Sequence, residues 1–92
     1  MRRALAGLHL ALGLFAAGCR GAALPEAASP AARLYVERCG TCHAAYNPRS
    51  MTAAMWEVQV QAMEPRMAQA GRPLSEHERH AILDYLTRNA GG

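Results

Sequence analysis

The sequence contains no lysine, so all ten of its basic side chains are arginines. Two of them, Arg2 and Arg3, lie at the extreme N-terminus. From Cys19 onward eight arginines stand against seven acidic residues, which leaves this part of the chain nearly neutral. A surface that binds nucleic acid carries a large excess of basic side chains. The composition therefore excludes nucleic acid from the expected partners.

The sequence also has no apolar run long enough to cross a bilayer. Its longest run, residues 4–17, has fourteen residues and is interrupted by two glycines and a histidine, whereas a spanning helix needs about 20 apolar residues. A short apolar run after the basic start Met1-Arg2-Arg3 is typical of a secretory signal peptide. We therefore predict a signal peptide over residues 1–18 and a periplasmic protein.

The end of this leader, Phe15-Ala16-Ala17-Gly18-Cys19, resembles a bacterial lipoprotein signal, in which small residues precede a lipidated cysteine. Ala16 stands where such signals prefer leucine. We predict a lipid on Cys19, with cleavage at an ordinary Ala-x-Ala-like site as the alternative. Residues 19–29 are mostly small and are predicted to form a flexible tether. Its ten residues after Cys19 would reach at most roughly 35 Å.

The sequence has only three cysteines, which is an odd number, and two of them are close together. The run Cys39-Gly40-Thr41-Cys42-His43 reads C-x-x-C-H, the attachment signature of a c-type haem. Two thiols at this spacing can each add to one vinyl group of a haem, and His43 can give the iron an imidazole nitrogen. The C-x-x-C pair also occurs in zinc sites and thiol redox sites, so a haem-free protein is an alternative.

Residues 30–92 are predicted to form one small domain without strands, because no alternating apolar pattern is found. Such a short chain supports only a marginal core, which a covalently held apolar cofactor would complete. Pro65 is predicted to end or kink the middle helix. Three sets of helix-start signals are present: Ser29-Pro30, Ser50 or Thr52, and a capping box of Ser75 and Glu78. The expected fold is all-α, with about three helices around one haem.

Over residues 29–90 the chain resembles the small single-haem class I cytochromes c. Leu34-Tyr35 precede Cys39 as in that family, and residues 82–86 match its Ile-x-x-Tyr-Leu pattern in the last helix. In the family these two helices cross beside the haem, so Leu34 and Tyr35 are expected at the haem edge. The resemblance implies that Cys39 and Cys42 carry the thioethers and that His43 is the proximal ligand.

The resemblance further implies a distal ligand from the middle of the chain, a methionine thioether. Met63 has the family spacing from Trp56, and Met67 has the family spacing to the start of the last helix. Both lie on the helical stripe that Trp56 and Val60 begin. Both stay open as ligands, with Met63 slightly preferred, and Met51 and Met55 are assigned to packing.

Two histidines, His77 and His80, lie opposite the apolar side of the last helix and are expected in solvent rather than on a bis-histidine haem. The indole N–H of Trp56 is expected to reach either a haem propionate or water.

The predicted function is electron transfer by one covalent haem c with His/Met axial ligation. No acid–base or nucleophilic catalytic group is identified, so the protein is not expected to be an enzyme. Its expected partners are redox proteins that contact the haem edge near Cys39 and Cys42, and the membrane surface through Cys19. A haem protein with an open distal site, serving ligand sensing or weak peroxidase activity, is the alternative.

Overall fold

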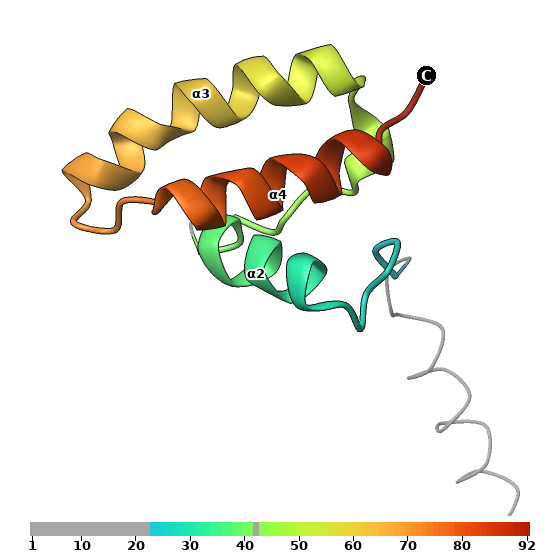
Figure 1. Cartoon of the computed structure of the whole chain (residues 1–92), viewed down its shortest axis with the longest axis horizontal. Coiled ribbons are helices and arrows are strands. Elements are labelled where there is room, and N and C mark those ends of the chain that lie inside the picture. The colour runs from blue at the N-terminus through green and yellow to red at the C-terminus, as the bar shows by residue number, and fades with distance from the viewer. Residues whose placement is uncertain (1–22, 42) are drawn as a thin grey trace, which may run out of the picture.

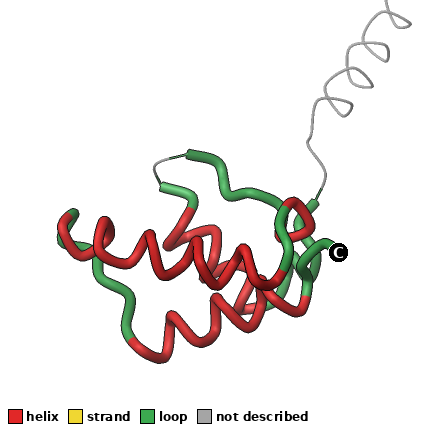
Figure 2. Tube along the Cα trace, turned by 90° about the horizontal axis from the view of Figure 1, so that it is seen from above, coloured by secondary structure: helices red, strands yellow, loops and turns green. Residues whose placement is uncertain are grey.

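The computed structural model describes residues 23–41 and 43–92, and its regular elements are all helical. The described residues contain three α-helices, α2 (Pro30–Cys39), α3 (Ala53–Gln69) and α4 (Glu76–Arg88), and one 3-10 helix, η1 (Pro48–Ser50). Helix α4 packs against both α3 and α2, and it lies between them in Figure 1. Seen from above, the helices are joined by loops, with no strand in the described part (Figure 2). The all-α prediction is confirmed.

Local capping determines where each α-helix begins. The side chains of Ser29, Thr52 and Ser75 each accept a hydrogen bond from a backbone N–H in the first turn, at 3.1, 3.2 and 3.0 Å. At α4 the Glu78 carboxylate also accepts a hydrogen bond from the backbone N–H of Ser75 at 3.1 Å, so the predicted capping box is complete. Of the two alternatives for α3, Thr52 is the cap and Ser50 belongs to η1.

Of the two alternatives predicted for Pro65, an end or a kink of the middle helix, the end is wrong, because α3 continues through Pro65 to Gln69. Proline removes one backbone donor from the helix, but packing can outweigh that loss. Here Glu64 also pairs with Arg79 of α4, with an N–O distance of 3.2 Å. The chain turns away only near Gly71, whose φ of 76° is a conformation that glycine adopts without strain.

One aromatic cluster joins the three α-helices. The ring of Tyr35 meets that of Trp56 edge-on, with centroids 6.2 Å apart, and lies 5.7 Å from the ring of Tyr85. The buried hydrophobic residues are Ala32, Tyr35, Trp56, Val60, Ile82, Tyr85 and Leu86. Each α-helix contributes to this single core.

The segment before α2 is attached to the end of α4. The Glu26 carboxylate accepts hydrogen bonds from Nε and Nη2 of Arg88, at 2.9 and 3.0 Å. It also accepts one from the side-chain amide of Asn89 at 2.6 Å. The hydroxyl of Tyr85 donates to the carbonyl of Pro25 at 2.9 Å. The hydrogen bonds from Arg88 lower the pKa of Glu26 to about 2. Pro25 and Glu26 belong to the predicted tether, residues 19–29. The chain therefore makes contacts with the helical domain before Pro30, where α2 begins.

The C-terminal residues lie against residues 49–51, just before α3. The backbone N–H of Gly91 donates to the carbonyl of Met51 at 2.9 Å. A Cβ atom at Gly91 would lie 2.2 Å from the carbonyl oxygen of Arg49, so only glycine permits this approach. Within residues 23–41 and 43–92, no helix is long and apolar enough to cross a membrane.

Candidate functional site

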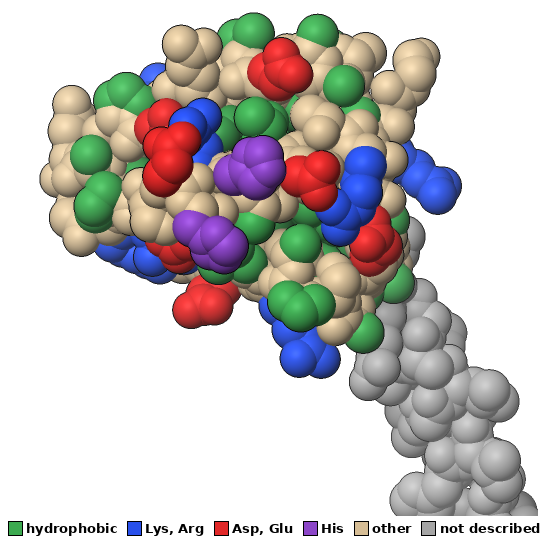
Figure 3. All heavy atoms as spheres, in the orientation of Figure 1, with side chains coloured by type: hydrophobic (Ala, Val, Ile, Leu, Met, Phe, Trp, Pro, Cys, Tyr) green, Lys and Arg blue, Asp and Glu red, His purple; other side chains and the backbone are tan. Residues whose placement is uncertain are grey.

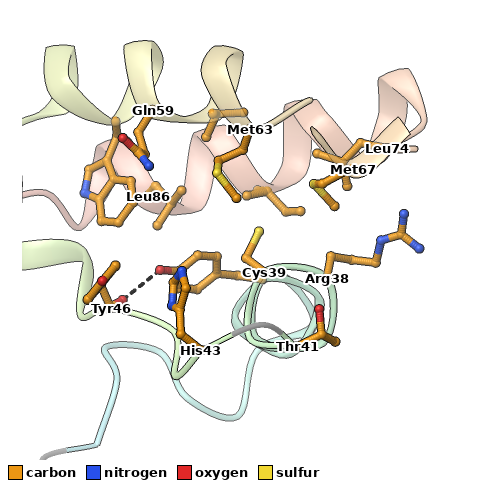
Figure 4. A pocket seen from close by; sticks show the side chains of 14 residues that line it. Arg38, Cys39, Thr41, His43, Tyr46, Gln59, Met63, Met67, Leu74 and Leu86 are labelled. Carbon is orange, nitrogen blue, oxygen red and sulfur yellow. Dashed lines mark hydrogen bonds between the residues drawn. The ribbon is translucent and has the colours of Figure 1, made fainter. Parts of the chain in front are cut away.

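An apolar cavity opens between the three α-helices. The space between its walls, including the part that opens to solvent, is about 720 Å³. The cavity is lined by Tyr35, Arg38, Cys39, Thr41, His43, Tyr46, Trp56, Gln59, Val60, Met63, Met67, Leu74, Ile82 and Leu86 (Figure 4). Five of the seven buried core residues are in this list, so the cavity is part of the core.

Helix α2 delivers Cys39 to this cavity, because Cys39 is its last residue. Gly40 caps the helix with an N–H bond to the carbonyl of Val36 at 2.9 Å, and a Cβ there would lie 2.5 Å from that oxygen. Burial raises the pKa of the Cys39 thiol, although Arg38 acts in the opposite direction. Reactive redox cysteines have lowered pKa values, so this environment does not favour the thiol redox alternative. Cys42 lies outside the described residues.

His43 is exposed to solvent and lines the cavity. Its Nδ1 lies 2.9 Å from the carbonyl oxygen of Ala44. A proton on Nδ1 would satisfy that contact and leave Nε2 free to bind a metal. The ring of Tyr46 lies against the imidazole with centroids 5.0 Å apart. Tyr35 ties the loop after His43 to α2, because its hydroxyl donates a hydrogen bond to the carbonyl of Tyr46 at 2.8 Å.

The two candidate distal ligands lie on the opposite wall. Met63 and Met67 are one turn apart on α3, half-buried, and both line the cavity. Figure 4 shows both side chains pointing from α3 toward α2, with Met63 nearer the middle of the cavity and Met67 nearer its Arg38 end. Met51 and Met55 do not line this cavity: Met51 packs against the core, whereas Met55 is 52% exposed and does not pack as predicted.

The donor set in this cavity fits a c-type haem. One wall offers a thiol and an imidazole from Cys39 and His43, and the other offers thioether sulfurs from Met63 and Met67. Imidazole and thioether are the axial ligands of haem in cytochromes c, and the apolar side chains between them suit a porphyrin. The structure thus brings together four of the five residues predicted for haem binding.

Two expectations about the neighbouring side chains are wrong. The indole N–H of Trp56 donates to the carbonyl of Pro48 at 2.7 Å, in the buried interior, so it reaches neither a propionate nor water. This hydrogen bond joins α3 to η1. Leu34 packs half-buried against the core but does not line the cavity, whereas Tyr35, Arg38 and Cys39 of the same helix do.

The two histidines of α4 lie on the outside, as predicted. His77 and His80 are exposed, and neither lines the cavity. In Figure 3 histidine side chains lie at the surface, with both acidic and basic side chains near them.

Several residues of the cavity were not singled out from the sequence. Gln59 was within reach of the pattern, since it follows Trp56 by three positions and precedes Met63 by four, which is helical spacing. Tyr46 and Leu74 lie outside the helices, where no periodicity signals which way a side chain points.

A small helical domain, a C-x-x-C-H motif at the end of one helix and an apolar cavity with imidazole and thioether donors define a c-type cytochrome. Residues 35–92 match the family described as dihaem cytochrome c, and the chain belongs to this family. No curated protein and no solved structure matches the chain.

Proposed function

We propose that this protein transfers electrons through one haem c held by thioether bonds to Cys39 and Cys42, with His43 and a methionine as axial ligands. The observation that carries the proposal is the convergence of Cys39, His43, Met63 and Met67 on one apolar cavity. When bound, the haem supplies an iron that gains and loses one electron. The chain's own residues bind it, exclude water from its faces and supply sulfur and nitrogen to the metal.

The family to which the chain belongs is named for two haems. This sequence contains a single C-x-x-C-H motif, and its third cysteine, Cys19, lies twenty residues before Cys39. A second haem attached through paired cysteines would have no thiols left in these 92 residues. One covalent haem per chain is therefore proposed.

The haem content tests this proposal directly. Protein expressed with its leader in a host that attaches c-type haem is expected to give a haem-stained band after denaturing electrophoresis. The pyridine haemochrome spectrum should give one haem per chain, because only one motif is present. Extraction of the colour by acid–acetone would contradict the covalent link, and a ratio of two would contradict the count.

We also propose export to the periplasm and attachment to the membrane through a lipid on Cys19. Support comes from the leader sequence and from the odd cysteine count, since the haem motif uses two of the three thiols. Residues 1–22 lie outside the described part of the structure. Two or more acyl chains hold a protein firmly on a bilayer, whereas one binds only marginally.

Exchange of Cys19 for serine is expected to move the cytochrome from the membrane pellet to the soluble fraction, because the site of lipid attachment is lost. The intact mass of the wild-type protein should correspond to a chain that starts at Cys19 with added acyl groups. A mature chain that starts elsewhere without lipid, or unchanged partitioning of the variant, would contradict the anchor.

A further inference from the structure

Arg38 connects the two walls of the cavity from its position directly before Cys39. Its Nη2 donates to the carbonyl oxygens of Arg72 and Pro73, at 3.1 and 2.7 Å. Those carbonyls belong to the loop between α3 and α4, 34 and 35 residues away in sequence. The guanidinium is charged, so these bonds are stronger than those between neutral groups.

The rest of the Arg38 side chain is confined within the same region. Its side chain is only 20% exposed, and its Nε is buried without a hydrogen-bond partner among the described residues. The nearest acidic group is Glu78 of α4, whose carboxylate oxygen lies 3.7 Å from that Nε. The guanidinium is thus held between the α3–α4 loop and the first turn of α4. In Figure 4 Arg38 lies at the end of the cavity where Met67 and Leu74 lie.

The loop that Arg38 holds follows the methionine-bearing end of α3 directly. The backbone N–H of Arg72 donates to the carbonyl of Met67 at 2.8 Å, which couples the loop to the last turn of the helix. Leu74, the residue after Pro73, lines the cavity. Within the described residues, no side chain of α2 other than Arg38 makes a hydrogen bond to this loop.

We propose that Arg38 is a positioning residue that holds the methionine-bearing end of α3 over the haem and thereby controls how readily the distal position opens. Arg38 binds no metal and acts through the loop of residues 70–74. The proposal rests on the proposed haem site, and it adds the residue that joins the attachment wall, at Cys39, to the distal wall.

The experiment compares the complete haem-loaded protein with Arg38→Ala, Arg38→Gln and the matched control Arg33→Ala. Arg33 lies on the same helix, is exposed, and makes no side-chain hydrogen bond or ion pair with any described residue. Two quantities are measured: the rate at which carbon monoxide binds the reduced protein, and the hydrogen exchange of backbone amides in residues 68–74. Both Arg38 variants are expected to raise each rate about tenfold, because both remove the guanidinium that bridges the two carbonyls. Arg33→Ala should leave both rates unchanged.

Rates within twofold of wild type in an Arg38 variant would overturn the proposal, as would equal increases in Arg33→Ala. If Arg38→Ala yields no haem-loaded protein, Arg38→Gln decides, because it keeps the first two methylene groups of the side chain. The proposed His/Met ligation fails separately, through absence of a sulfur-to-iron band in the wild-type protein. Hydrogen exchange in residues 68–74 still decides the role of Arg38 in that case.

Discussion

Exchange of Met63 for alanine is expected to abolish the near-infrared sulfur-to-iron band of the oxidised protein, whereas exchange of Met67 should leave it. The reduction potential of Met63→Ala should fall by on the order of 0.1 V, because a soft thioether favours the reduced iron and axial ligands set the potential over a range of roughly 0.8 V. Met63 is the expected ligand because it has the family spacing from Trp56 and points into the middle of the cavity (Figure 4). The band is read from the absorption spectrum, and the potential from a redox titration.

Met55→Ala is the matched control, since Met55 is on the same helix but exposed and away from the cavity. Loss of the band in Met67→Ala alone would assign the ligand to the other sulfur. Retention in both single variants would contradict the expected difference. Rapid binding of carbon monoxide by reduced wild-type protein would instead support the open distal site, with its sensing or peroxidase function.

The second large effect is expected from removing both attachment cysteines. A Cys39→Ala/Cys42→Ala protein purified free of haem should lose its cooperative thermal transition, or melt roughly 12–24 °C below the haem-loaded wild type, which corresponds to about 3 kcal/mol in a domain of this size. The physical reason is that Tyr35, Trp56 and three aliphatic core residues face the cavity that the haem would fill. Burying one such side chain contributes about 1.5–3 kcal/mol.

Circular dichroism measures this prediction in two spectral ranges. The far-ultraviolet signal follows the helices, and the near-ultraviolet signal follows the packing around Trp56. Cys19→Ser, which keeps the haem motif, controls for loss of a cysteine as such. A haem-free double variant that melts cooperatively at the wild-type temperature would show that the three helices form their core without the cofactor.

The helix boundaries were predictable because their signals are local. Ser29-Pro30 and the Ser75–Glu78 capping box act within one turn, so the sequence contains the whole interaction. The fate of α3 at Pro65 was not predictable in this way. It depends on contacts along α4, such as the ion pair of Glu64 with Arg79, which is fifteen residues further along the chain.

The same distinction applies to the site. Cys39, Cys42 and His43 could be singled out as candidates because their chemistry requires a fixed spacing, and helical spacing placed Met63 and Met67 on one face. That spacing could not separate the two methionines, since both belong to the same stripe and both line the cavity. The partner of Trp56 could not be found either, because the carbonyl of Pro48 comes within reach only once η1 has folded against α3.

The attachment of Glu26 to Arg88 limits how far the haem domain could stand from a membrane. With a lipid on Cys19, only five chain steps separate the anchor from Leu24, which packs against the core. An extended chain covers roughly 17 Å in five steps, about half the reach of the whole predicted tether. The hydrogen bonds from Arg88 lower the pKa of Glu26 to about 2, so this carboxylate stays ionised at ordinary pH. If Cys19 carries the proposed lipid, the start of the haem domain would lie within roughly 17 Å of the bilayer surface, and redox partners at that surface would be within its reach.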